Sequence, residues 1–335
     1  MYKSYEFFVE FQDKKQEKKI DDVFAKIRRL SIQLVKEKER AKNEYKNLIK
    51  NEYPELIKKE LNHMKELGLY PPNIKLNEMP FCSFLLNIDL QLRSFYLSKD
   101  EDEFYTCDNP ICKDYVFKVP MIRASSWKGN LHWVAVMLLA NKTNPSAKEF
   151  AKERLKIACL FGSERGVDIF SERLESYLSK IYPEAHAIYI NLLKEKSNTG
   201  SFSGRLKFFP TFWDNIGLDI INPHDRKSRT GKVPIWLEGV PPKAKGIFTL
   251  LYVPFDLIGL DKEKIKHEVK EDLKLVIKLI KEMMLNFGFS AKKGSGYGVI
   301  NPEISGELLT NAPVLIDGKD KIVFTDLEWL INEIQ

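Results

Sequence analysis

Cysteine and histidine are scarce in this sequence. Only four cysteines and five histidines occur in 335 residues, and the closest cysteines, Cys107 and Cys112, have the spacing C-x4-C. Structural zinc sites usually combine tighter pairs with further cysteines or histidines. Together with Cys82 and Cys159 these cysteines could still form a zinc site, but we expect buried free thiols.

Long apolar runs and the common enzyme motifs are also missing. No run is long enough to span a bilayer, and Met1–Lys15 is not an apolar leader. The sequence contains no G-x-x-x-x-G-K-[ST], H-E-x-x-H or G-x-S-x-G motif. These absences predict a cytoplasmic protein with no membrane partner, and they argue against ATPase, zinc-protease and serine-hydrolase chemistry.

The charge is nearly balanced. Lys and Arg number 53 and Asp and Glu 47, which leaves a net charge of +6. Such an excess permits a polyanionic partner without requiring one, so the distribution of the basic residues is more informative than their sum.

The pattern along the chain predicts an α+β protein in two parts. Residues 1–80 contain a short strand at Tyr5–Phe11, a basic helical arm from about Lys14 to Glu66 and a proline-containing linker. Residues 81–335 form the larger domain, with a strand over Ser83–Leu97, a helical insertion at about 140–200 and an amphipathic helix over Asp261–Phe287. The arm is either packed on the body, which is the commoner case, or a docking surface for a neighbour.

Three segments combine backbone amides with basic side chains. In the first, Ser125 or Ser126 is predicted to cap a helix, so that free amides, Lys128 and Gly129 face one point. The second is a basic loop or hairpin, and the third is a glycine-rich loop. The candidate contacts are Arg226, Lys227, Arg229 and Lys232 in the second segment, and Lys292, Lys293, Gly294, Gly296, Tyr297 and Gly298 in the third.

Each segment alone has a commoner explanation, namely a capped helix, a solvated loop or a tight turn. Their repetition favours a nucleic-acid ligand, because such groups hold phosphates without reading the base sequence. Aromatic residues near the segments could stack on bases. These are Trp127, Trp133, Trp213, Trp236 and Tyr297, of which Trp133 fits a helix core better.

The order of these motifs resembles the RAMP superfamily of CRISPR-associated proteins, and in particular the Csm-like and Cmr-like subunits of type III effector complexes. The resemblance extends from about Ser83 to Ile300, and the basic arm has no counterpart in it. It rests on D-N-P-x-x-K-D from Asp108, S-S-x-K-G from Ser125, G-R-L-x-F from Gly204 and G-x-x-A-K-x-x-x-G-Y-G from Gly288.

The resemblance implies an RRM-like, or ferredoxin-like, core with helical insertions and a projecting basic hairpin at about Asn222–Lys245. It also implies that the first and third segments bind the phosphates of a CRISPR guide RNA. The implied partners are guide RNA, target RNA and sibling subunits of a ribonucleoprotein that acts in antiviral defence.

In backbone-forming members of the family, an aspartate before the helix cleaves target RNA, and Asp108 matches that position. Such a carboxylate could bind Mg²⁺ or another divalent metal, or orient a 2′-hydroxyl for attack. An aspartate before Asn-Pro is equally a good turn former. Arg123-Ala124 replaces the Pro-Gly usual before Ser-Ser, which argues against cleavage. The glycine-rich segment from Gly288 and the N-P-H element at Asn222–His224 resemble those of the single-copy subunit that caps the complex, in which cutting is not expected.

Three alternatives stay open. The chain could be a target-cleaving backbone subunit that uses Asp108 as a metal-dependent endoribonuclease. It could be a metal-independent endonuclease that processes guide RNA with His132 or His224 as the base. It could also be a helical interaction protein whose basic segments are solvated and bind no RNA.

Overall fold

The computed structural model describes residues 21–34, 37–100, 105–107, 109–163, 174–197, 201–221, 234–316 and 318–334. Within these ranges the chain is a mixed α+β protein built on a five-stranded antiparallel sheet. Over the same ranges, no helix has the length and apolarity needed to cross a bilayer. The strand predicted at Tyr5–Phe11 and the start of the predicted arm lie outside the described residues.

The central strand of the sheet is β1, which pairs with a neighbour on each side. Its Leu86 lies opposite Leu308 of β10 and Leu250 of β9. The strand is shorter than the predicted Ser83–Leu97, because the chain leaves the sheet after Gln91. In spatial order the sheet contains β11 (Lys321–Phe324), β10 (Ser305–Thr310), β1 (Phe84–Gln91), β9 (Lys245–Tyr252) and β5 (Leu206–Phe208).

One face of the sheet forms the main hydrophobic core. Alternate residues of β1 are buried there, as the two-residue period of a strand requires: Phe84, Leu86, Ile88 and Leu90. The opposite face carries a smaller cluster centred on Leu85.

Two long helices pack on the main core. Helix α5 (Ala124–Ala140) follows β1, and α9 (Lys262–Glu282) follows β9. The Trp127 ring of α5 meets Phe248 of β9 edge-on, with 4.9 Å between ring centroids. An apolar stripe along α9 is fully buried, and the Asp261 side chain caps its first turn. The predicted helix over Asp261–Phe287 is therefore present, its last turn being a π-helix at Met283–Phe287.

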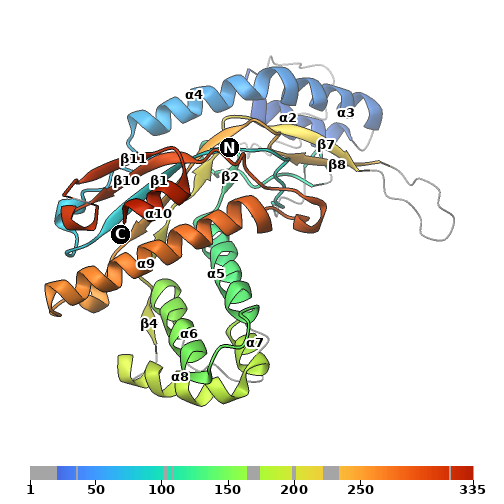
Figure 1. Cartoon of the computed structure of the whole chain (residues 1–335). Helices are drawn as coiled ribbons and strands as arrows, with labels where there is room; N and C mark the ends of the chain where they lie inside the picture. The colour runs from blue at the N-terminus through green and yellow to red at the C-terminus, as the bar shows by residue number, and fades with distance from the viewer. Residues whose placement is uncertain are drawn as a thin grey trace, which may run out of the picture.

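The predicted insertion at about 140–200 is mainly helical in the part that the structure describes. Helices α6 (Ala147–Phe161), α7 (Leu174–Ile181) and α8 (Pro183–Lys196) extend away from the sheet at the bottom of Figure 1. Ser146 and Glu149 form a capping box that fixes the start of α6.

Arg205, from the G-R-L-x-F motif, ties β5 to α9. Its buried guanidinium donates two hydrogen bonds to Asp256, at 2.8 and 2.6 Å, and one each to Glu268 and Asp272, both at 2.6 Å. Tyr252 donates to Asp272 at 2.7 Å. Because this arginine has its carboxylate partners within the fold, it serves packing and is not available to an RNA.

The described part of the N-terminal arm packs on the body and shares its hydrophobic core. Tyr53 donates a hydrogen bond to the carbonyl of Lys118 at 2.8 Å, and Tyr70 to that of Phe212 at 3.0 Å. Instead of one helix, the arm contains α2 (Val23–Gln33), α3 (Lys38–Asn47), a π-helix at Leu48–Glu52 and α4 (Tyr53–Glu66). Pro54 lies in the first turn of α4, where proline is tolerated.

The remaining elements are short. A two-stranded ribbon of β7 (Gly217–Ile221) and β8 (Ile235–Gly239) stands beside α2 and α3 in Figure 1. Two further strand pairs are β2 (Met121–Ile122) with β6 (Thr211–Phe212), and β3 (Gly162–Ser163) with β4 (Phe202–Ser203). The last helix is α10 (Leu327–Glu333).

A buried carboxylate joins the arm to this ribbon. Glu238 of β8 has no exposed surface, and it accepts hydrogen bonds from Tyr45 of α3 at 2.6 Å, from Tyr105 at 3.2 Å and from the amide of Ile111 at 2.9 Å. It also forms a buried ion pair with Lys113. Three segments distant in sequence therefore depend on one side chain.

We expect Glu238→Ala to lower the free energy of unfolding by about 3–5 kcal/mol, because it leaves the Lys113 ammonium buried without its partner. Urea unfolding followed by circular dichroism measures this loss. The control is Glu153→Ala, which breaks the exposed pair with Lys142 and should leave the free energy of unfolding nearly unchanged, because solvent screens that pair. Equal losses in the two variants would contradict the assigned role of Glu238.

Candidate nucleic-acid interface

The first predicted segment lies at the start of α5, but the helix begins earlier than expected. Arg123, with an extended backbone, is the N-cap, and no side chain caps the helix. Its carbonyl accepts hydrogen bonds from the amides of Ser126 at 2.9 Å and Trp127 at 3.1 Å. The capping role predicted for Ser125 or Ser126 is therefore wrong. Both hydroxyls lie in the exposed first turn, beside amides that precede the first intrahelical hydrogen bonds.

Trp127 fixes the orientation of that turn. Its side chain is fully buried, its indole N–H donates to the Thr211 hydroxyl at 3.0 Å, and its ring contacts Phe289 at 4.8 Å between centroids. Trp213 is equally buried. Neither ring can stack on a base, which corrects that part of the prediction. Anchored in this way, α5 exposes Ser125, Ser126, Lys128 and Gly129 on the opposite side.

The third predicted segment is a tight loop with three residues in the left-handed region. Lys292 has φ 58°, Gly296 has φ 77° and Gly298 has φ 71°. A Cβ atom at Gly298 would lie 2.2 Å from the Ser290 Cβ, whereas one at Gly294 would meet no atom within 4 Å. Gly298 is therefore required for the close packing of the loop on itself, and Gly294 leaves its backbone open to a ligand.

The glycine-rich loop is held by the segment that follows β1. The amide of Gly298 donates to the carbonyl of Phe95 at 2.9 Å, and the amide of Ala291 to that of Leu97, also at 2.9 Å. The Ser290 hydroxyl donates to the Leu97 carbonyl at 3.0 Å and accepts from the Leu97 amide at 2.7 Å. These bonds fix the loop in place next to the sheet.

Asn130 joins the first and third segments. Its amide nitrogen donates to the carbonyl of Ser126 at 2.9 Å and to that of Phe289 at 3.5 Å, and its oxygen accepts from Lys293. The Lys293 ammonium also lies 4.8 Å from the centroid of the Trp133 ring. The exposed start of α5 and the glycine-rich loop thus form one continuous surface.

The glycine-rich loop also contacts the base of the β7–β8 ribbon. Tyr297 donates a hydrogen bond to Asp219 of β7 at 2.6 Å, and this bond raises the pKa of Tyr297 to about 12. The second predicted segment lies between these two strands. Its residues Arg226, Lys227, Arg229 and Lys232 are outside the described residues, so their role stays a prediction.

Positive charge accumulates along the exposed side of α5. Burial and the charge of Lys128 lower the pKa of Lys207, whose ammonium donates to the Gly204 carbonyl at 2.9 Å. Burial, with a smaller effect of Lys128, also lowers the pKa of His132 to about 4. His132 stacks on Phe161 and is neutral at pH 7, so it is a weak base. The local field favours an anion.

The predicted catalytic residue, Asp108, lies outside the described residues, but both of its neighbours are anchored. Cys107 donates from its thiol to the carbonyl of Trp236 at 3.1 Å, and the carbonyl of Asn109 accepts from the amide of Glu238 at 3.0 Å. The Asn109 side chain donates to the carbonyl of Ser98 at 3.0 Å. The chain on both sides of Asp108 is therefore held against β8 and the segment after β1.

The residues that the structure describes contain no group of three or more His, Cys, Asp or Glu that could hold a metal. All four cysteines are buried free thiols, and burial raises the pKa of Cys82 and of Cys159 to about 11.

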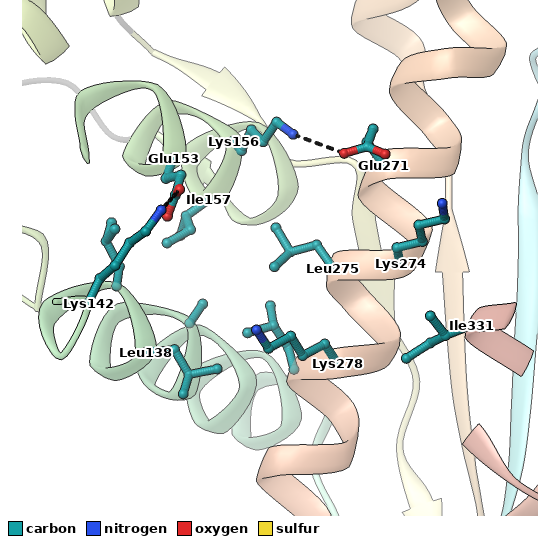
Figure 2. Close-up of a pocket in the computed structure, with 13 residues that line it drawn as sticks. Leu138, Lys142, Glu153, Lys156, Ile157, Glu271, Lys274, Leu275, Lys278 and Ile331 are labelled. Carbon is teal, nitrogen blue, oxygen red and sulfur yellow. Dashed lines mark hydrogen bonds and ion pairs between the residues drawn. The ribbon is translucent and has the colours of Figure 1, made fainter. Parts of the chain in front are cut away.

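A groove of about 520 Å³ between α5, α6, α9 and α10 lies at the other end of α5 (Figure 2). Its wall is largely apolar, with Leu138, Ile157 and Leu275 pointing into it, and its rim carries the Lys156–Glu271 ion pair at 3.8 Å. Its two glutamates, Glu153 and Glu271, are paired with Lys142 and Lys156, and the groove is separate from the surface formed by α5 and the glycine-rich loop.

The sequence comparisons identify the family. The model of the RAMP superfamily matches residues 105–301, a range that contains the first turn of α5, the ribbon and the whole glycine-rich loop. The chain belongs to the RAMP superfamily. A search of curated proteins found no match to this RAMP protein.

Solved structures resemble this RAMP protein only distantly. A chain in the cryo-EM structure of the type III-B Cmr-beta complex bound to cognate target RNA is 13% identical, with a TM-score of 0.43, and the alignment covers 80% of this chain and 75% of that one. For a chain of the Csm3–Csm4 subcomplex of the type III-A interference complex, the identity is 13%, the TM-score 0.39 and the coverage 78% and 97%. For Cmr6 from Pyrococcus furiosus these values are 19%, 0.29, 65% and 98%.

Sequence reasoning missed two residues that organise this surface. Asn130 and Asp219 link the segments, but a single asparagine on a helix and a single aspartate on a strand carry no pattern that distinguishes them from solvated residues. The position of Asn130 directly after Lys128-Gly129 was the one available signal.

We expect Gly298→Ala to disorder the glycine-rich loop, because the added Cβ overlaps Ser290 and alanine disfavours φ 71°. Limited proteolysis should cut the loop faster in this variant, and the free energy of unfolding should fall by about 1–3 kcal/mol. Gly294→Ala is the matched control and should leave both measurements unchanged. A loop equally resistant in the two variants would contradict the packing described for Gly298.

Proposed function

We propose that this RAMP protein is a guide-RNA-binding subunit of a type III CRISPR effector complex in antiviral defence. The observation that carries the proposal is the junction made by Asn130, which unites the first turn of α5 and the glycine-rich loop in one surface. That surface offers backbone amides together with Lys128, Lys292 and Lys293. Such groups suit the phosphates of an RNA strand and impose no base sequence.

The strand order supports an RRM-like core for this subunit. Along the chain the elements run β1, α5, β5, β9, α9 and β10, and across the sheet β10, β1, β9 and β5 are neighbours. We infer from this order a split β-α-β core, with β11 added at one edge. In this reading the β7–β8 ribbon is the base of the projecting hairpin, and its basic residues extend the guide-RNA surface.

We further propose that the protein packs against sibling subunits and meets target RNA through the guide. Two structures that contain chains similar to this one, a type III-B complex bound to target RNA and a type III-A subcomplex, accord with this role. The alternative of a guide-processing endonuclease is weaker, because burial and Lys128 lower the pKa of His132 to about 4. The other candidate base for this alternative is His224, which lies outside the described residues.

We expect a variant with Lys128→Ala and Lys292→Ala to bind guide RNA more weakly and with less salt dependence. Each lost phosphate contact on single-stranded RNA should reduce the slope of log affinity against log salt by about 0.7, or about 1.4 for both. Fluorescence anisotropy over a salt series measures the slope. The control carries Lys319→Ala, which is exposed and distant in sequence from both segments. An unchanged slope in the double variant would leave the interaction-protein alternative in place.

Cleavage of target RNA through Asp108 is a separate proposal with its own test. If Asp108 is catalytic, Asp108→Ala should abolish a specific set of cuts by the reconstituted complex in Mg²⁺ while assembly is unchanged. If Asp108 is a turn residue, the same cuts persist and the subunit is a guide-binding cap. Size-exclusion chromatography of the complex separates a loss of chemistry from a loss of assembly.

A further inference from the structure

Helix α3 of the arm carries a row of lysines beside the β7–β8 ribbon (Figure 1). Lys38, Lys42 and Lys46 recur at every fourth position and so lie along one side of the helix. Among the described residues, no carboxylate lies within ion-pair distance of these three. Within the helix Glu44 pairs with Arg29 at 3.0 Å, and Glu39 is the other acidic residue.

Two of these lysines converge on one tryptophan. The ammonium of Lys46 lies 3.9 Å, and that of Lys42 5.6 Å, from the centroid of the Trp236 ring on β8. Trp236 is only partly buried, and Ile220, opposite it on β7, is 51% exposed. Two cations held near one ring repel each other, and an anion placed between them would remove that repulsion.

This cluster and the glycine-rich loop lie on opposite faces of the ribbon. Asp219, which binds Tyr297 of the loop, and Ile220, which pairs with Trp236, are consecutive in β7. Consecutive side chains of a strand point to opposite faces. A strand of RNA that leaves the loop and passes the edge of the ribbon would therefore reach Trp236 and the lysines.

We propose that Lys38, Lys42, Lys46 and Trp236 form a second contact for single-stranded RNA, beyond the stretch held at the α5 turn and the glycine-rich loop. The proposal rests on the proposed function and adds a surface from the arm, outside the residues that match the family model. Lysines beside a partly exposed aromatic ring such as that of Trp236 are typical of single-strand binding, in which bases stack and phosphates are neutralised. A protein partner fits less well, because lysine is depleted at protein interfaces.

The test compares two oligouridylate probes of about 8 and about 16 nucleotides, within the range that one single-strand-binding domain covers. The variant is Lys42→Gln with Lys46→Gln in the full-length chain. It should bind the short probe as the wild type does. It should bind the longer probe roughly tenfold more weakly at about 0.15 M salt, and the slope of log affinity against log salt should fall by about 1.4. The matched control is Lys58→Gln with Lys59→Gln, two exposed lysines of α4 that should leave both affinities unchanged.

A second variant tests the ring. Trp236→Leu should lose photocrosslinking of 4-thiouridine RNA to the peptide that contains position 236, and Trp236→Phe should retain it, because phenylalanine still stacks. Urea unfolding checks that both variants are folded.

The outcomes separate this proposal from the one on which it rests. If the α3 variant binds the longer probe like the control while the short probe still binds, the second contact does not exist and the guide-RNA site stands. If neither probe binds the wild type, both proposals fail. If RNA binding is intact but sibling subunits no longer associate with the α3 variant, the surface is a protein contact and the proposal is overturned.

Discussion

The buried carboxylate of Glu238 is the interaction on which the rest of this structure depends. It accepts hydrogen bonds from the arm, through Tyr45, and from the chain before α5, through Tyr105 and Ile111, and it neutralises Lys113 in the interior. A charge buried in this way is tolerated only if all its partners are present. The arm, the ribbon and the chain around position 108 are consequently parts of one folded unit.

The candidate RNA surface follows from that unit and needs few specialised side chains. The buried Trp127 side chain fixes the first turn of α5 through its hydrogen bond to Thr211. The carbonyls of Phe95 and Leu97 hold the glycine-rich loop by accepting hydrogen bonds from it. The groups that remain exposed at the first turn of α5 and the glycine-rich loop include main-chain atoms and lysine side chains. Because these bonds hold the turn and the loop in place, a ligand bound there would cost little further conformational freedom. Its amides and lysines would suit phosphates of any base sequence, as the proposed guide RNA would require.

Sequence patterns predicted the elements with strong periodicity and missed the contacts made by single residues. The stripe on α9, the alternation in β1 and the glycine spacing around Gly296 each repeat several times, so local sequence was enough to place them. The start of α5 was misplaced because Ser125 and Ser126 are good capping residues by type, whereas the backbone enters the helix at Arg123. Burial of Trp127 and Trp213 depends on distant strands and has no local signal.

The same limit applies to the site. Asn130 contributes hydrogen bonds between α5 and the glycine-rich loop, and Asp219 links the loop to the ribbon, but neither residue belongs to a recognisable motif. The repetition of backbone amides with lysine predicted a shared nucleic-acid ligand for the two segments. The family resemblance implied that this ligand is a guide RNA.

The ribbon is attached at its base through both of its strands. Tyr297 of the glycine-rich loop binds β7 through Asp219, and Tyr45 of the arm binds β8 through Glu238. The ribbon is therefore held at two points, one on each strand. A displacement of the ribbon would strain two phenol–carboxylate hydrogen bonds. One joins β7 to the glycine-rich loop, and the other joins β8 to the arm. Movement of the ribbon would therefore affect the glycine-rich loop and helix α3 of the arm at the same time.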